Sequence, residues 1–146
     1  MPRHPGQYAR MLTERLASRD VAVWLVNTGW TGGPYGTGER MNIAHTRSTV
    51  RAALDGRLAS APTRTDPIFG IEVPLDCPDV PARILDPRST WADTDAYDRQ
   101  AQRLASMFAA NFAAYADGVT DDVRAAGPIV DPTTPAPHIG SDPGAG

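Results

Sequence analysis

An unbroken apolar run, Val-Ala-Val-Trp-Leu-Val at residues 21–26, constrains the fold of this chain more than any other feature. Its short length and its β-branched and aromatic residues favour a strand that is buried on both faces. Residues 7–19, just before it, place apolar side chains at helical spacing and predict an amphipathic helix. A helix, a short link and a buried strand are typical of an α/β layer.

A glycine-rich loop, residues 27–38, follows the predicted strand directly. In open α/β sheets, ligands bind beyond the carboxyl ends of strands, and glycines let a backbone approach a ligand closely. Arg40 adds a planar cation that can stack on a ring or pair with an anion. The loop is not a Walker A motif, because no Lys-Ser or Lys-Thr follows its glycines. Two interpretations stay open: a ligand-binding loop and a structural turn.

Periodicity and the positions of proline predict the middle of the chain. A helix is expected over residues 47–54, with Thr46 as its N-cap. Residues 57–90 contain many X-Pro pairs, which disfavour helix at the residue before each proline. We therefore expect mostly loop there, with a short strand at residues 68–73 and an extended piece at residues 84–85.

The longest helix is predicted over residues 95–117, where an apolar stripe recurs at helical spacing before Gly118. Residues 121–126 are expected to add one more turn. From residue 127 onward the chain is rich in Pro, Gly, Thr and Asp and has few apolar anchors, which predicts a disordered tail. The predicted architecture is a mixed α/β piece with a small incomplete sheet, three helices and long loops.

Composition excludes several classes of protein. The net charge of −3 gives no basic surface for nucleic acid or anionic lipid. No apolar run approaches the roughly 20 residues that cross a bilayer, and the first residues lack the apolar core of a signal peptide. Cys77 is the only cysteine, which excludes an internal disulfide and a multi-cysteine zinc site. We expect a cytoplasmic protein without nucleic-acid or membrane partners.

No local pattern predicts a catalytic residue or a metal ligand. The three histidines, His4, His45 and His138, are dispersed and have no Cys or Glu at metal-ligand spacing. No serine lies in the Gly-x-Ser-x-Gly context of a hydrolase nucleophile. The residue patterns alone thus support an α/β fragment with a glycine-rich loop and a nearby arginine.

Five stretches of the sequence carry one shared resemblance: residues 23–41, 45–47, 66–70, 80–81 and 84–91. They include Val-Asn-Thr-Gly-Trp-Thr-Gly-Gly and Ile-Leu-Asp-Pro-Arg-Ser-Thr-Trp. In residue identity, order and spacing they are similar to the C-terminal region of ATP-dependent phosphoenolpyruvate carboxykinases. The similarity runs over residues 1–128, which therefore resemble the C-terminal portion of that family's nucleotide-binding domain. Residues 129–146 carry no such resemblance and are the expected tail.

The resemblance implies a reaction and three site residues. The family converts oxaloacetate and ATP into phosphoenolpyruvate, ADP and CO2 in gluconeogenesis, with Mg2+ on the nucleotide and commonly Mn2+ as a second metal. Arg40 matches an arginine near the base, Met41 matches an aliphatic residue that packs on the adenine, and Thr46 matches a threonine of the nucleotide site. Thr46 can hold both this role and that of a helix cap. Many members have Lys where this chain has Glu39, so a negative charge replaces a positive one.

The resemblance also implies what the chain lacks. The family's phosphate-binding loop, its metal-binding Lys, His and Asp, and its substrate-binding arginines are expected upstream of this sequence. The implied partners are ATP, oxaloacetate and the upstream part of the enzyme, and we expect the chain to be inactive by itself. A second interpretation stays open, in which the chain is a non-catalytic nucleotide-binding or interaction module.

Overall fold

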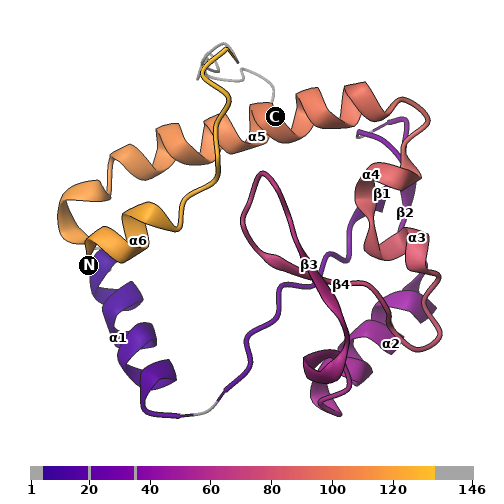
Figure 1. Ribbon diagram of the computed structural model, residues 1–146, viewed down its shortest axis with the longest axis horizontal. Helices are drawn as coiled ribbons and strands as arrows, with labels where there is room; N and C mark the ends of the chain where they lie inside the picture. Colours follow the sequence, from indigo (N-terminus) through magenta and orange to yellow (C-terminus); the bar gives the residue numbers. More distant parts are fainter. Residues whose placement is uncertain (1–4, 20, 35, 134–146) are drawn as a thin grey trace, which may run out of the picture.

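The computed structural model describes residues 5–19, 21–34 and 36–133. Within these ranges the chain is a mixed α/β structure with two separate two-stranded antiparallel sheets, which confirms the predicted fold class (Figure 1). The helices are α1 (Pro5–Ala17), α2 (Ile43–Leu54), α3 (Ala82–Leu85), α4 (Pro87–Thr90), α5 (Thr94–Ala113) and α6 (Asp121–Ala125). The strands are β1 (Trp30–Thr31), β2 (Glu39–Arg40), β3 (Thr63–Thr65) and β4 (Glu72–Pro74).

The three longest helices, α1, α2 and α5, are the three that the sequence predicts. α2 begins earlier than expected, because Asn42 rather than Thr46 is its N-cap. The Asn42 side chain accepts a hydrogen bond from the Ala44 amide at 2.8 Å. Thr46 therefore lies inside the helix, where its own amide donates to the Asn42 carbonyl at 3.2 Å. The predicted capping role of Thr46 was wrong, since Asn42 already satisfies the exposed amide at the helix start.

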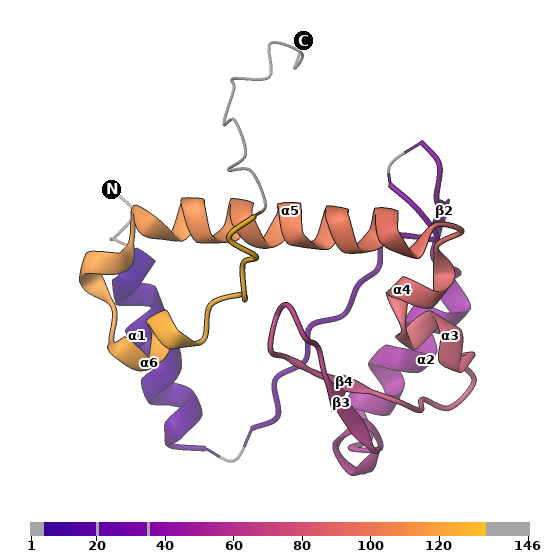
Figure 2. The ribbon, with the colours of Figure 1, turned by 45° about the horizontal axis from the view of Figure 1, so that its top comes forward.

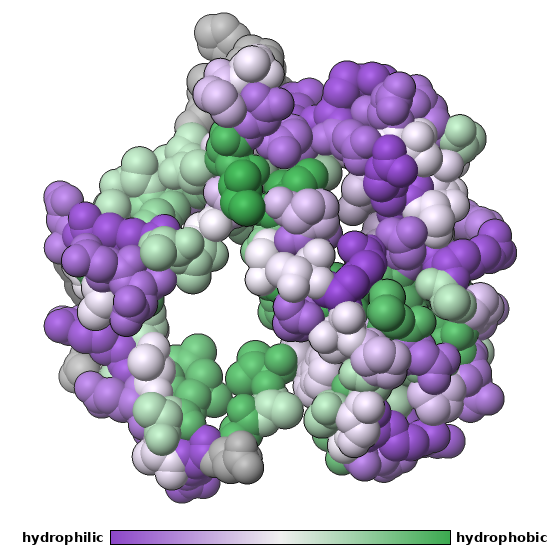
Figure 3. Space-filling model, viewed as in Figure 1, coloured by the Kyte–Doolittle hydropathy of each residue, from purple (hydrophilic) through white to green (hydrophobic). Residues whose placement is uncertain are grey.

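The predicted buried strand at residues 21–26 was wrong for the described part of the chain. The segment has no strand assignment there, and Val23 and Leu25 expose 66% and 83% of their surfaces. A strand needs a neighbour for its backbone groups, and none of the described segments pairs with this one. It runs from α1 toward β1 (Figure 1), and apolar surface borders the opening beside it (Figure 3).

Residues 57–90 are more ordered than the sequence indicates. β3 and β4 form a hairpin in which Thr63, Arg64 and Thr65 pair with Pro74, Val73 and Glu72. The Asp66 carboxylate closes the turn by accepting from the amides of Ile68 at 2.9 Å and Phe69 at 2.7 Å. The predicted strand at residues 68–73 is therefore correct only in its last two residues, which belong to β4, and residues 84–85 are helical in α3 rather than extended.

A small core lies between α2 and the segments that follow it. Its buried members are Ala52, Leu58, Cys77 and Val80, and Trp24, Ala53, Ile84 and Leu85 pack against them. Leu58 is only 3% exposed. These side chains come almost entirely from residues 52–85, so elements close together in the sequence make this core.

α5 crosses the molecule above the β3–β4 hairpin, and α6 lies beside α1 near the other end of α5 from β1 and β2 (Figures 1 and 2). Asp93 caps α5 by accepting from the Ala96 amide at 3.0 Å. Of the predicted apolar stripe, Ala101 and Ala105 are buried, whereas Phe108 is 54% exposed. No helix within the described ranges has the length and apolarity to cross a bilayer.

Two residues of the predicted tail make backbone contacts with the body of the chain. The Ile129 amide donates to the Ile68 carbonyl at 2.7 Å, and the Asp131 amide donates to the Gln102 side chain at 3.0 Å. Residues 134–146 of the predicted tail lie outside the described residues. The division of the chain at residue 128 stays a prediction.

Candidate functional site

The glycine-rich segment forms an antiparallel hairpin, β1–β2, that ends at two of the predicted site residues. Trp30 pairs with Arg40 and Thr31 pairs with Glu39. The Met41 amide donates to the Gly29 carbonyl at 2.9 Å, which extends the pairing by one residue. Arg40 and Met41 are thus held by backbone hydrogen bonds at the base of the β1–β2 hairpin.

Close backbone packing explains two of the glycines in this hairpin. A Cβ atom on Gly38 would lie 2.6 Å from the carbonyl oxygens of both Gly33 and Thr31. Gly32 has φ of +76°, a conformation that side chains disfavour. These two positions need glycine for the hairpin itself, as the structural-turn interpretation expects. A ligand role for the loop rests on the residues at its base.

The three predicted nucleotide residues lie at the junction of the β1–β2 hairpin and α2. Arg40 is exposed, and Met41 and Thr46 are half-buried. Thr46 shares one face of α2 with Ile43 and Val50, both of which are exposed. The junction therefore presents a guanidinium, a thioether and a hydroxyl within seven residues of chain.

Met41 also lines an open cavity of about 310 Å³, together with Trp30 and Thr31 of the hairpin. The wall of the cavity is largely apolar, and it includes the aromatic rings of Trp24, Trp30, Phe69, Trp91 and Tyr97. Burial raises the pKa of the Tyr97 hydroxyl, so this wall is less well hydrated than the surface. The volume falls at the lower end of the range for small-molecule sites, which is about 300–1,000 Å³.

Arg40 and Thr46 are not among the residues that line this cavity. Successive side chains of an extended segment point to opposite faces, so Arg40 and Met41 face different directions. The three residues are therefore close together in the sequence, but the structure does not gather them around one cavity. Their joint role in binding a nucleotide stays a prediction.

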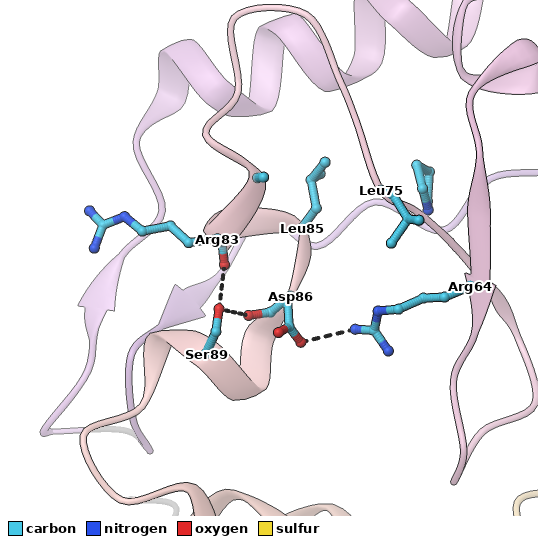
Figure 4. A pocket seen from close by; sticks show the side chains of 8 residues that line it. Arg64, Leu75, Arg83, Leu85, Asp86 and Ser89 are labelled. Atoms are coloured by element: carbon cyan, nitrogen blue, oxygen red, sulfur yellow. Dashed lines mark hydrogen bonds and ion pairs between the residues drawn. The ribbon is translucent and has the colours of Figure 1, made fainter.

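A second pocket, of about 390 Å³, lies between β3 and the α3–α4 corner. Figure 4 shows Arg64 reaching Asp86 at 3.0 Å while Arg83 extends away from both. The Ser89 hydroxyl is bonded to the Asp86 carbonyl at 2.8 Å and lies 3.3 Å from the Arg83 carbonyl. These contacts among polar groups of the lining join the α3–α4 corner to β3.

The α4–α5 corner brings further residues to the hairpin. Arg88 of α4 forms two hydrogen bonds with the Asp98 carboxylate of α5, at 2.8 and 2.9 Å. This bidentate contact holds the pKa of the exposed Asp98 carboxyl below its usual range. Thr90, at the end of α4, then contacts Thr31 and Gly32 of the β1–β2 hairpin. The sequence analysis missed Thr90, because nothing in the local sequence of α4 indicates which distant backbone the Thr90 hydroxyl contacts.

The described residues do not fit the metal ions that the resemblance implies. Among residues 5–19, 21–34 and 36–133, no three His, Cys, Asp or Glu side chains gather as a metal site requires. His45 instead has its ring Nδ1 3.3 Å from the Asp79 carbonyl oxygen.

Comparisons with known proteins identify the family of the chain. The family model for phosphoenolpyruvate carboxykinase matches residues 1–83. A phosphoenolpyruvate carboxykinase (ATP) of Thermus thermophilus is 55% identical over 128 residues, and those of Paracoccus denitrificans and Sinorhizobium medicae are 56% and 58% identical over 126 and 128 residues. These matches cover 86–88% of this chain and 24% of each relative. The chain spans about a quarter of the length of these relatives, and it belongs to the ATP-dependent phosphoenolpyruvate carboxykinase family.

Proposed function

We propose that this chain provides the adenine side of the ATP site in an enzyme that converts oxaloacetate and ATP into phosphoenolpyruvate, ADP and CO2. The proposal rests on the identity of 55–58% with relatives named phosphoenolpyruvate carboxykinase (ATP). The matched family model includes the hairpin–helix junction with Arg40, Met41 and Thr46. A guanidinium that stacks on a purine, an apolar neighbour and a hydroxyl suit the recognition of a base.

In this reaction oxaloacetate loses CO2 to give an enolate, and the enolate oxygen then takes the γ-phosphoryl group from ATP, which leaves ADP. Such transfer depends on in-line positioning and on cations that stabilise the developing charge. Mg2+ and Mn2+ supply that charge in the family. The share of this chain is to bind and orient the base, so that the phosphates reach groups held elsewhere in the enzyme.

The remainder of the enzyme is the partner that this proposal requires. The chain spans 24% of its relatives, and residues 21–26 leave Val21, Val23 and Leu25 exposed beside an unpaired backbone. A strand of the partner that pairs with this segment would satisfy its backbone groups and cover these side chains. We place the assembled activity in the cytoplasm, at the entry of gluconeogenesis.

Calorimetry with ATP tests the nucleotide site, first on this chain and then on its mixture with the remaining three quarters of a relative. We expect Arg40→Ala to weaken ATP binding about tenfold, the loss of a favourable cation–ring contact. Arg47→Ala is the matched control, because Arg47 is also exposed and lies nearby in α2. Equal affinities of the two variants would contradict the assignment of Arg40.

Formation of phosphoenolpyruvate tests the reaction. We expect none from this chain alone and measurable turnover from the mixture with the relative's remaining part. Turnover by the chain alone would overturn the proposed division of labour. ATP binding without turnover in the mixture would instead favour the non-catalytic nucleotide-binding module.

A further inference from the structure

We propose that Thr90 is a positioning residue for the nucleotide site, acting through the β1–β2 hairpin that carries Arg40 and Met41. The inference rests on the proposed function, since it assigns Thr90 a purpose only if the hairpin base meets ATP. Thr90 does not belong to the hairpin: it lies at the end of α4, 58 residues beyond Gly32.

The Thr90 hydroxyl uses its full hydrogen-bonding capacity. It donates to the Pro87 carbonyl at 2.7 Å and accepts from the Gly32 amide at 3.1 Å and the Thr31 hydroxyl at 3.2 Å. A hydroxyl has one donor and two acceptor positions, and all three are occupied here. One oxygen atom thus joins a helix end to the Thr31 side chain of β1 and to the backbone of Gly32, the residue after β1.

Thr90 contacts β1, the strand that pairs with Arg40 of β2. Thr31 pairs with Glu39 and Trp30 pairs with Arg40, so a restraint on Thr31 and Gly32 passes across the ladder to β2. A Cβ on Gly32 would lie 3.4 Å from the Thr90 carbonyl, which shows how closely the two backbones approach. Thr31, Met41 and Thr90 all line the same 310 Å³ cavity.

The α4 end of this connection is itself held in place. Arg88 is bound to Asp98 of α5 by the bidentate pair, and the Asp86 carboxylate that precedes α4 is bound to Arg64 of β3. Trp91, the next residue, packs edge-on against Tyr97 with ring centroids 5.6 Å apart. Thr90 therefore joins the hairpin to a corner that is fixed from two other elements, as positioning residues require.

Amide hydrogen exchange and ATP calorimetry on the full chain test this role. Thr90→Val keeps the shape of the side chain and removes its hydroxyl. We expect exchange at the Gly32 amide to accelerate about tenfold, the factor for roughly one lost hydrogen bond. ATP binding is expected to weaken by about threefold to tenfold, because the hairpin base is less well ordered. Thr90→Ser keeps the hydroxyl and should restore both values.

Thr120→Val is the matched control, since Thr120 is exposed and makes no side-chain capping bond at α6. Unchanged exchange at Gly32 in Thr90→Val would overturn the proposed anchor. Faster exchange with unchanged ATP affinity would overturn the positioning role and leave Thr90 purely structural. If neither the chain nor its mixture with the relative's remainder binds ATP, the proposed function fails, and the positioning role fails with it. The exchange rate of the Gly32 amide still tests separately whether Thr90 anchors the hairpin.

Discussion

Two apolar regions of this chain differ in how far they are buried. The core around Leu58, Cys77 and Val80 is buried, whereas the equally apolar residues 21–26 are largely exposed and unpaired within the described chain. Apart from Trp24, the core residues obtain their neighbours from α2, α3 and the turns between them. Residues 21–26 need a neighbouring strand, which is a long-range partner. Apolar composition therefore shows what a segment can bury, and only the rest of the fold decides whether it does so.

Truncating one leucine in each region gives the largest expected difference. Leu58→Ala should lower the free energy of unfolding by about 2–5 kcal/mol, because it removes a buried side chain and leaves a cavity. Leu25→Ala should change it by less than about 0.5 kcal/mol, since the side chain is already in solvent. Urea unfolding of the isolated chain measures both. A similar cost at the two positions would break the comparison and show that residues 21–26 are buried in solution.

The elements that sequence reasoning predicted are those whose contacts are local. α1, α2 and α5 follow from apolar periodicity along the helix itself. The β3–β4 hairpin was half-missed, because Thr-Arg-Thr in β3 shows no apolar alternation and its pairing is set by the Asp66 turn. The strand at residues 21–26 was predicted from composition, which carries no information on whether a partner strand lies beside it.

The candidate site divides in the same way. Arg40, Met41 and Thr46 were identified from a resemblance that extends along the whole segment, and the hairpin places the first two beside each other. Thr90 was out of reach, since its role depends on a contact across 58 residues. The glycines of the loop were noticed, yet their backbone packing at Gly38 is visible only in three dimensions.

The start of the packed region depends on a cap that the sequence placed four residues too late. Asn42→Ala should lower the free energy of unfolding by about 1 kcal/mol, because the Ala44 amide loses its acceptor. Thr46→Ala should cost less, since Thr46 lies inside α2 and does not cap it. Thermal unfolding of both variants decides between them, and a larger loss for Thr46→Ala would restore the original assignment.

A turn in the packed region carries a small strain that can be relieved. Asp79 has φ of 60°, the positive value at the third position of the turn from Cys77 to Val80. Asp79→Gly should raise the free energy of unfolding by about 0.5 kcal/mol, because glycine adopts this conformation freely but loses more chain entropy on folding. Asp76→Gly, at a residue without positive φ, should lower it. Chemical denaturation in parallel measures the two changes, and a loss of stability in both variants would contradict the strain.

The smallest expected effect is a pH dependence that arises from the core itself. Burial raises the pKa of the Cys77 thiol, so the folded chain keeps this proton at a pH where the unfolded chain releases it. The unfolded state then binds fewer protons, and the free energy of unfolding falls as pH rises from the ordinary thiol range, about 8.5, toward the folded pKa. The chain has no lysine, so few other groups titrate in this window. Urea titrations from pH 7.5 to 9.5 should show a downward slope that Cys77→Ala abolishes. A slope of equal size in Cys77→Ala would mean that the buried thiol is not the source of the pH dependence. The core would then be more open to water than its contrast with the exposed residues 21–26 implies.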